Sequence, residues 1–233
     1  MKIKNKKASH VGVVLSFVIF ITFLIFLYSA VEPRIKLDKS KQFSLDFLKV
    51  ELLKEISSNL TIITVSGEVN GNRRCLEIDI GDLFLEGQNA IVKDKEERIV
   101  GLDLSEDVLK IKSSKGVVEV FKIYFSKEFE DNSENLKKCS NAEIKRINTN
   151  EYVFEKKITE TLEAVEIDYE TIKNKFKLSI DTEFGFSFVD KAGQIIGTQE
   201  KDVSINIYAE EIPIQYVDEN ANINSGFINI KVC

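Results

Sequence analysis

The chain has 233 residues, enough for an N-terminal segment followed by one α+β domain or two small ones. Its hydrophobic content of 43% is that of a globular protein, which excludes an intrinsically disordered chain and a protein with many membrane spans. The net charge of −6 is uneven: residues 1–10 carry +4, residues 11–42 add +2, and residues 43–233 are left with −12. Because so acidic a domain repels phosphate backbones, we expect no nucleic acid among its partners.

An uncharged stretch of twenty-one residues runs from Val11 to Val31. About twenty residues span a bilayer core as a helix, and hydroxyls such as those of Ser16, Thr22 and Ser29 can bond back to carbonyls one turn earlier. The alternatives are a buried core helix and a cleaved secretory signal, whose apolar stretch is only about 7 to 15 residues long. We predict a basic tail at 1–10, a transmembrane helix at 11–31 and a linker at 32–42.

The orientation follows from the flanks of this stretch. Each flank carries four Lys or Arg residues, but those of the tail have no acid beside them. A large domain after a first apolar segment is usually translocated. We therefore predict a single-pass protein in the lipid bilayer, with a cytoplasmic N-terminus and an extracytoplasmic domain at residues 43–233.

A short junction precedes the apolar stretch, with the sequence Lys6-Lys7-Ala8-Ser9-His10-Val11-Gly12-Val13-Val14. It resembles the class III signal peptides of archaeal type IV pilin-like proteins, in which a basic and a small residue precede an uncharged helix. The resemblance implies processing between Ala8 and Ser9 on the cytoplasmic side. It also implies that the helix stays in the product, as a membrane anchor or as the buried core of a filament.

The helix of assembled pilins usually continues into the globular domain. Here Pro33 and the charged residues 34–39 predict an interruption, because proline lacks the N–H that a helix interior needs. The whole pattern of basic tail, apolar helix and acidic strand-rich domain is also similar to small uncharacterised membrane-anchored archaeal proteins, a likeness that implies no activity.

The first part of the domain combines a short helix with strands. Leu45, Leu48, Leu52 and Ile56 recur at helical spacing, with Ser44 placed to cap the helix start. Alternating apolar residues then predict strands at 60–69, 75–80, 90–92, 98–104, 108–112 and 117–126. A polar surface loop is expected at 127–141.

The second part of the domain again contains a helix followed by strands. A stripe at spacings of three and four predicts a helix within 154–178, made by Ile158, Leu162, Val165, Tyr169, Ile172 and Phe176. Strands are expected at 184–188, 203–217 and 223–232, the last two joined by a turn at 218–222. We predict an α+β fold with a strand-rich antiparallel domain, two helices, and two halves at 43–126 and 142–233.

Few residues of the domain have side chains suited to catalysis or metal binding. The sole histidine, His10, lies in the tail before the anchor, which removes Ser-His-Asp and Cys-His catalysis from the domain. Three cysteines are too few for the usual zinc site. In an oxidising exterior Cys75 and Cys139 can form a disulfide, although free buried thiols are equally compatible with the sequence, and Cys233 is interpreted as an ordinary terminal residue.

Three further motifs are weak. Residues 218–224 place oxygen ligands at alternate positions, but they lack the glycine and glutamate of a calcium loop, so a hairpin turn is favoured. Asn59-Leu60-Thr61 is a glycosylation sequon if the domain lies outside. The carboxylate pairs Asp79 with Asp82 and Glu210 with Glu211 are interpreted as solvated surface.

These features favour a membrane-anchored surface protein of pilin-like or structural type, which works through contacts with other proteins or with itself and needs no cofactor. The second hypothesis is a membrane-tethered module that binds a ligand or partner; exposed Phe or Tyr on a sheet face would favour it. An enzyme ranks third, because no nucleophile is paired with a base.

Overall fold

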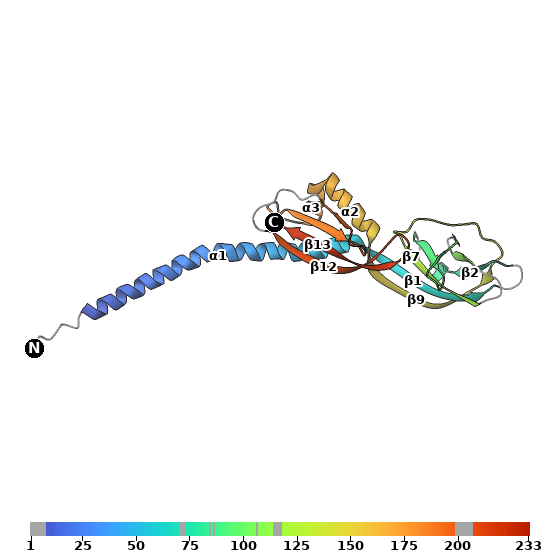
Figure 1. Ribbon diagram of the computed structural model, residues 1–233, viewed down its shortest axis with the longest axis horizontal. Helices are drawn as coiled ribbons and strands as arrows, with labels where there is room; N and C mark the ends of the chain where they lie inside the picture. Colours follow the sequence, from blue (N-terminus) through green and yellow to red (C-terminus); the bar gives the residue numbers. More distant parts are fainter. Residues whose placement is uncertain are drawn as a thin grey trace, which may run out of the picture.

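A long N-terminal helix leads into a strand-rich region in the computed structural model, which describes residues 8–69, 73–83, 85, 87–105, 107–113, 118–198 and 207–233 (Figure 1). The predicted α+β class is confirmed. The helical elements are α1 (Ala8–Ile56), the 3-10 turn η1 (Gly81–Leu83), α2 (Glu155–Ile167) and α3 (Tyr169–Lys175).

The α1 helix contains 49 residues, which corresponds to about 74 Å. Its window Gly12–Ser29 has a mean hydropathy of 2.5 and no buried residue, so this part is long and apolar enough to cross a membrane. The Thr22 hydroxyl donates to the Val18 carbonyl at 3.0 Å, as predicted for a hydroxyl in such a helix. At the other end Leu45, Leu48 and Leu52 are buried in the folded region.

The prediction that the linker 32–42 interrupts the helix is wrong. Residues 32–42 are helical and continuous with both neighbours, so the expected start at Ser44 is wrong as well. Proline removes only one intrahelical bond, a cost of about 3 kcal/mol that long helical segments on both sides can outweigh. Figure 1 shows a bend partway along α1, and proline is a common cause of such bends.

Within the residues described, two sheets make up the strand-rich region. A nine-stranded sheet has the order β11-β10-β13-β12-β9-β1-β7-β3-β4, and a four-stranded sheet has the order β5-β6-β2-β8. The bounds are β1 Ser57–Glu68, β2 Cys75–Asp79, β3 Asn89–Lys93, β4 Ile99–Val100, β5 Leu102–Leu104, β6 Val108–Lys112, β7 Val118–Ser126, β8 Ser140–Asn141, β9 Glu143–Phe154, β10 Phe184–Val189, β11 Ile195–Gly197, β12 Tyr208–Val217 and β13 Ile223–Val232.

Pairing is mixed rather than purely antiparallel, which corrects the prediction. Strand β12 runs parallel to β9 where Tyr216 and Val217 face Val153 and Phe154, and β2 pairs in parallel with β8. The other strand pairs are antiparallel. The first residues of the predicted strand 203–217 lie outside the described residues, and the described strand begins at Tyr208.

The strand-rich region has two lobes. The proximal lobe packs the end of α1 with α2, α3, β10, β12 and β13, whereas the core of the distal lobe is built from β1, β2, β3, β6 and β7. The long strands β1 and β9 run through both lobes (Figure 1). These lobes differ from the predicted halves, because residues 45–56 belong to the core of the C-terminal half.

The predicted helix within 154–178 is split into α2 and α3. Its stripe is correct, since Ile158, Leu162 and Val165 are buried on α2 and Phe176 follows α3. The break falls at Asp168, whose carboxylate accepts the backbone N–H of Thr171 at 3.1 Å and thereby caps α3.

Candidate functional site

The lobes meet at a small third core, which we call the junction. It consists of the buried residues Leu60, Ile91, Tyr124, Phe129, Phe154, Val217 and Ala221. Ile91 and Tyr124 come from β3 and β7 of the distal side, whereas Val217 and Ala221 come from the β12–β13 hairpin of the proximal side. The tip of that hairpin therefore reaches across to the distal lobe.

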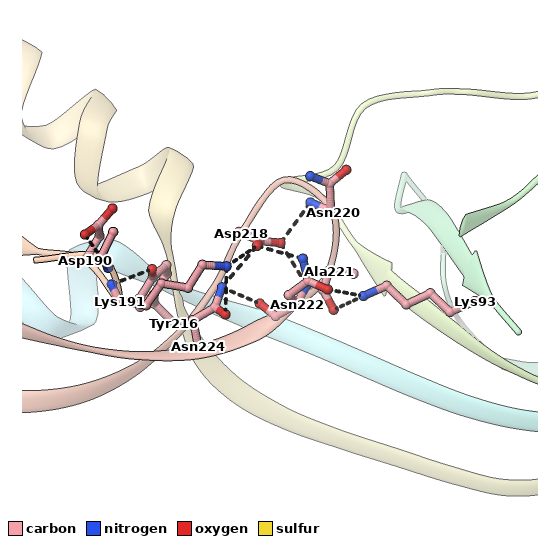
Figure 2. A network of polar contacts seen from close by, with 10 residues as sticks. Lys93, Asp190, Lys191, Tyr216, Asp218, Asn220, Ala221, Asn222 and Asn224 are labelled. Carbon is pink, nitrogen blue, oxygen red and sulfur yellow. Dashed lines mark hydrogen bonds and ion pairs between the residues drawn. The ribbon is translucent and has the colours of Figure 1, made fainter. Parts of the chain in front are cut away.

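The hairpin tip at 218–222 is organised around one carboxylate, as Figure 2 shows. Asp218 Oδ1 accepts the backbone N–H groups of Asn220 at 3.0 Å and Asn222 at 2.8 Å, and Oδ2 accepts the side-chain amides of Asn222 at 2.8 Å and Asn224 at 3.0 Å. The hairpin prediction is thus confirmed. Four N–H donors fill the carboxylate where a calcium loop would present oxygen ligands, so the calcium alternative does not fit the geometry.

These donors also set the charge of Asp218. Burial would raise the pKa of this carboxyl, but the hydrogen bonds from Asn222, Asn224 and Asn220 favour the ionised form, and the net pKa lies below its ordinary value of 3.8. The ammonium of Lys191, 3.8 Å from Oδ2, adds a partly exposed counter-charge. Asp218 is therefore an anion held in a ring of donors.

Lys93, the last residue of β3, meets this tip from the distal side. Its side chain is only 2% exposed, and Nζ donates to the Ala221 carbonyl at 3.0 Å and to Asn222 Oδ1 at 2.7 Å. The Tyr124 ring centroid lies 5.3 Å from Nζ. Desolvation by burial lowers the pKa of Lys93, although the charges of Glu97 and Asp218 oppose that shift.

A neighbouring turn completes the network. The Asp190 carboxylate accepts the backbone N–H groups of Ala192 and Gln194, each at 2.8 Å, and the backbone N–H of Lys191 donates to the Tyr216 hydroxyl at 3.3 Å. The Lys191 ammonium lies 3.2 Å from Asn224 Oδ1 (Figure 2). Two loops of the proximal lobe are thus tied together at the point where the distal lobe makes contact.

An acidic groove of about 730 Å³ lies beside the junction, between α2 and these loops. Eight carboxylates line it against two lysines, namely Glu128, Glu130, Glu155, Glu160, Glu163, Asp190, Asp218 and Glu219 against Lys156 and Lys191. Burial raises the pKa of Glu155, and the neighbouring Asp218, Asp190 and Glu219 raise it further. Within the described residues, no group of three or more His, Cys, Asp or Glu side chains is placed to hold a metal ion.

A second cavity, of about 370 Å³, lies in the proximal lobe between α2 and the strands β10 and β13. Val165, Phe184, Phe186 and Ile207 supply apolar walls, and Cys233 contributes to its rim. The Cys233 thiol is free and half-buried, and burial raises its pKa, which disfavours the reactive thiolate.

The predicted cysteine pair and sequon lie away from the junction. Cys75 and Cys139 form a disulfide that ties β2 to the residue before β8. Asn59 is exposed on β1, but Thr61 of its sequon is buried and its hydroxyl lies 2.9 Å from that of Thr149. Glycosylation at Asn59 stays a prediction.

The remaining candidate residues are those of the processing site and the carboxylate pairs. They either have structural partners or have side chains outside the described part of the chain. Ala8 and Ser9 begin α1, but their side chains and that of Asp82 lie outside the described part. Asp79 accepts the backbone N–H of Gly81 at 3.1 Å, and Glu210 forms an ion pair with Lys49 of α1. One carboxylate of each pair, Asp79 and Glu210, thus has a structural partner.

No protein family, curated protein or solved structure matches the chain. Its function is therefore inferred from its own residues. The junction was missed by sequence reasoning because Lys93 and Asn222 are 129 positions apart; the available signal was a lysine at the end of the apolar run 90–92.

Proposed function

We propose that this chain is a single-pass, membrane-anchored surface protein of pilin-like type, whose outer domain works through contacts with other proteins or with copies of itself and not through catalysis. The observation that carries the proposal is α1, a single helix with an uncovered apolar part at one end and a part buried in the folded domain at the other. A bilayer would bury the apolar part, since side chains such as Phe17, Ile25 and Phe26 are each more than 60% exposed.

The continuity of α1 supports the pilin-like interpretation. The resemblance at Ala8 and Ser9 implies a helix that serves as anchor or filament core and continues into the domain. A continuous helix would also hold the domain at a fixed distance from the bilayer, because the sixteen steps from Ser29 to Leu45 correspond to about 24 Å.

A second apolar stripe supports contacts through α1 outside the membrane. Phe43, Phe47 and Val50 follow one another at spacings of four and three, on the helix side opposite the buried Leu45 and Leu48. Phe43 and Val50 are 71% and 62% exposed. A helix that is apolar on two sides is suited to pack against the domain on one side and against another helix on the other.

The N-terminus of the mature protein tests the processing and the anchor together. Mass spectrometry of the membrane fraction should give a chain that starts at Ser9 and retains the apolar helix. A start near Val31 would indicate a cleaved secretory signal and would contradict the anchor.

Cysteine cross-linking tests the self-contact. With Cys233 replaced by serine, Phe43→Cys should give a covalent dimer in oxidised native membranes. Gln42→Cys is the matched control, because this exposed position lies off the apolar stripe on the same helix turn. Equal dimer yields, or none from Phe43→Cys, would contradict contact through this stripe.

The second candidate function, a membrane-tethered ligand-binding module, is supported by the cavity of about 370 Å³ beside β10. This volume lies at the small end of the range for ligand sites. Native mass spectrometry of the detergent-released protein would support this candidate if a small molecule co-purified in stoichiometric amount and was lost in Phe186→Ala. A mass equal to that of the protein without a bound small molecule would favour the structural function.

A further inference from the structure

The junction brings a buried amine and a half-buried amide together. Lys93 Nζ lies 2.7 Å from Asn222 Oδ1, and the Lys93 side chain is 2% exposed. The Tyr124 ring lies beside Nζ and the buried Ala221 is next to Asn222, while the charges of Glu97 and Asp218 act on the amine from nearby. Water is thus largely kept from the Lys93 amine, whereas Asn222 is half-buried.

The Asn222 amide is held from both sides. Its oxygen accepts from Lys93, and its nitrogen Nδ2 donates to Asp218 Oδ2 at 2.8 Å. Only this orientation of the amide satisfies both partners, because an ammonium donates and a carboxylate accepts. The amide carbon therefore lies between an amine on one side and a carboxylate that is hydrogen-bonded to its own nitrogen on the other (Figure 2).

We propose that Lys93 and Asn222 condense into an intramolecular amide bond, with Asp218 holding the leaving amide nitrogen, so that the two lobes become covalently joined. The reaction needs the neutral amine, which forms when Nζ releases one proton to solvent. The desolvation that lowers the pKa of Lys93 increases the neutral fraction.

The step balances without a co-reactant. The Nζ lone pair attacks Asn222 Cγ and forms the new C–N bond, and a proton passes from the attacking nitrogen to Nδ2, which is bound to the same tetrahedral carbon. Asp218 Oδ2, 2.8 Å from Nδ2, stabilises the positive charge that forms on this nitrogen, the Cγ–Nδ2 bond breaks, and ammonia leaves. No atom changes oxidation state. Holding the two groups at hydrogen-bond distance supplies the entropic advantage of an intramolecular reaction.

The bond would change the mechanical connection between the lobes. Besides the sheet strands that pass through both lobes, a covalent link would then run from β3 of the distal lobe to the β12–β13 tip of the proximal lobe. A surface protein pulled at its outer end would transmit load through this link. The inference concerns the junction alone and does not depend on membrane insertion or on pilin-like assembly.

Mass spectrometry of the full chain tests the proposal. The detergent-extracted, reduced and denatured protein should be lighter than its sequence by one ammonia, after correction for its measured N-terminus. Trypsin should fail to cut after Lys93, and fragmentation should locate a branched peptide that joins Lys93 to Asn222. Fragmentation is needed because ring closure of an asparagine to a succinimide loses the same mass.

Two variants sharpen the test. Lys93→Arg keeps a charged donor but provides no amine that can form this amide, and it should have the full mass. Asp218→Asn should retain the hairpin and reduce the linked fraction at least tenfold. The proposal is overturned if the wild-type chain has the full mass, if Asn222 is recovered unmodified in a linear peptide, or if Asp218→Asn is linked as completely as wild type.

Discussion

Leu52→Ala should destabilise the domain strongly, although Leu52 belongs to the helix that begins with the exposed apolar window Gly12–Ser29. The Leu52 side chain is fully buried in the proximal core among residues of α1, α2, β10, β12 and β13. The substitution removes three carbons, worth about 2.4 kcal/mol of transfer free energy at about 0.8 kcal/mol each, and leaves a cavity that adds to the loss. We expect the free energy of unfolding to fall by about 3 kcal/mol.

Thermal unfolding of the full chain in mild detergent, followed by circular dichroism of the strands, measures this loss. For a domain of this size, about 3 kcal/mol corresponds to a decrease of about 6 to 12 °C in Tm. Val50→Ala is the matched control on the same helix, because Val50 is 62% exposed and should change Tm by less than about 2 °C. Equal shifts for the two variants would refute the claim that the end of α1 is part of the domain core.

Three further variants test other parts of the account by urea unfolding. Replacing Cys75 and Cys139 by alanine should cost about 4 kcal/mol, because the disulfide closes a loop with a sequence separation of 64; a loss below about 1 kcal/mol would contradict this. The folded-state pKa of Asp218 lies below the ordinary 3.8, so its ionised form stabilises the fold above that pH and the contribution is lost as pH falls through the folded value. The stability gap between wild type and Asp218→Asn should thus be constant near neutral pH and narrow below about pH 4, and a gap that widened in acid would reverse the argument. Gly226→Ala should cost about 2 kcal/mol, since its Cβ would lie 2.6 Å from a backbone carbonyl oxygen, whereas the exposed neighbour Ser225→Ala should be neutral.

Elements with a strong apolar period were predictable. The stripes that contain Leu48 and Ile158 are buried as expected, because one buried face imposes a period on the sequence. The hairpin at 218–222 was also predictable, since Asp and Asn are the residues that cap and close such turns.

Elements set by tertiary context were not predictable. Strand β9 was missed because most of its residues from Glu143 to Glu151 are exposed, so no alternation marks it; its pairing with β1 places it in the sheet. Pro33 suggested a break by a local rule that the surrounding helix overrides. The parallel contact of β12 with β9 joins segments far apart in sequence, which local patterns do not encode.

The candidate site likewise has one part that the sequence predicts and one part that it does not. The Asp218 turn could be recognised from its sequence, but the approach of Lys93 depends on how two lobes meet. A buried lysine leaves little trace in a sequence, because lysine at a strand end usually points to solvent.

Protease accessibility in intact cells tests the central claim that α1 spans the membrane with the domain outside. With a tag after Cys233, an external protease should remove this tag in intact cells, while a cytoplasmic marker protein survives until the membrane is opened. Protection of the C-terminal tag in intact cells, or recovery of the uncleaved chain in the soluble fraction, would contradict the account.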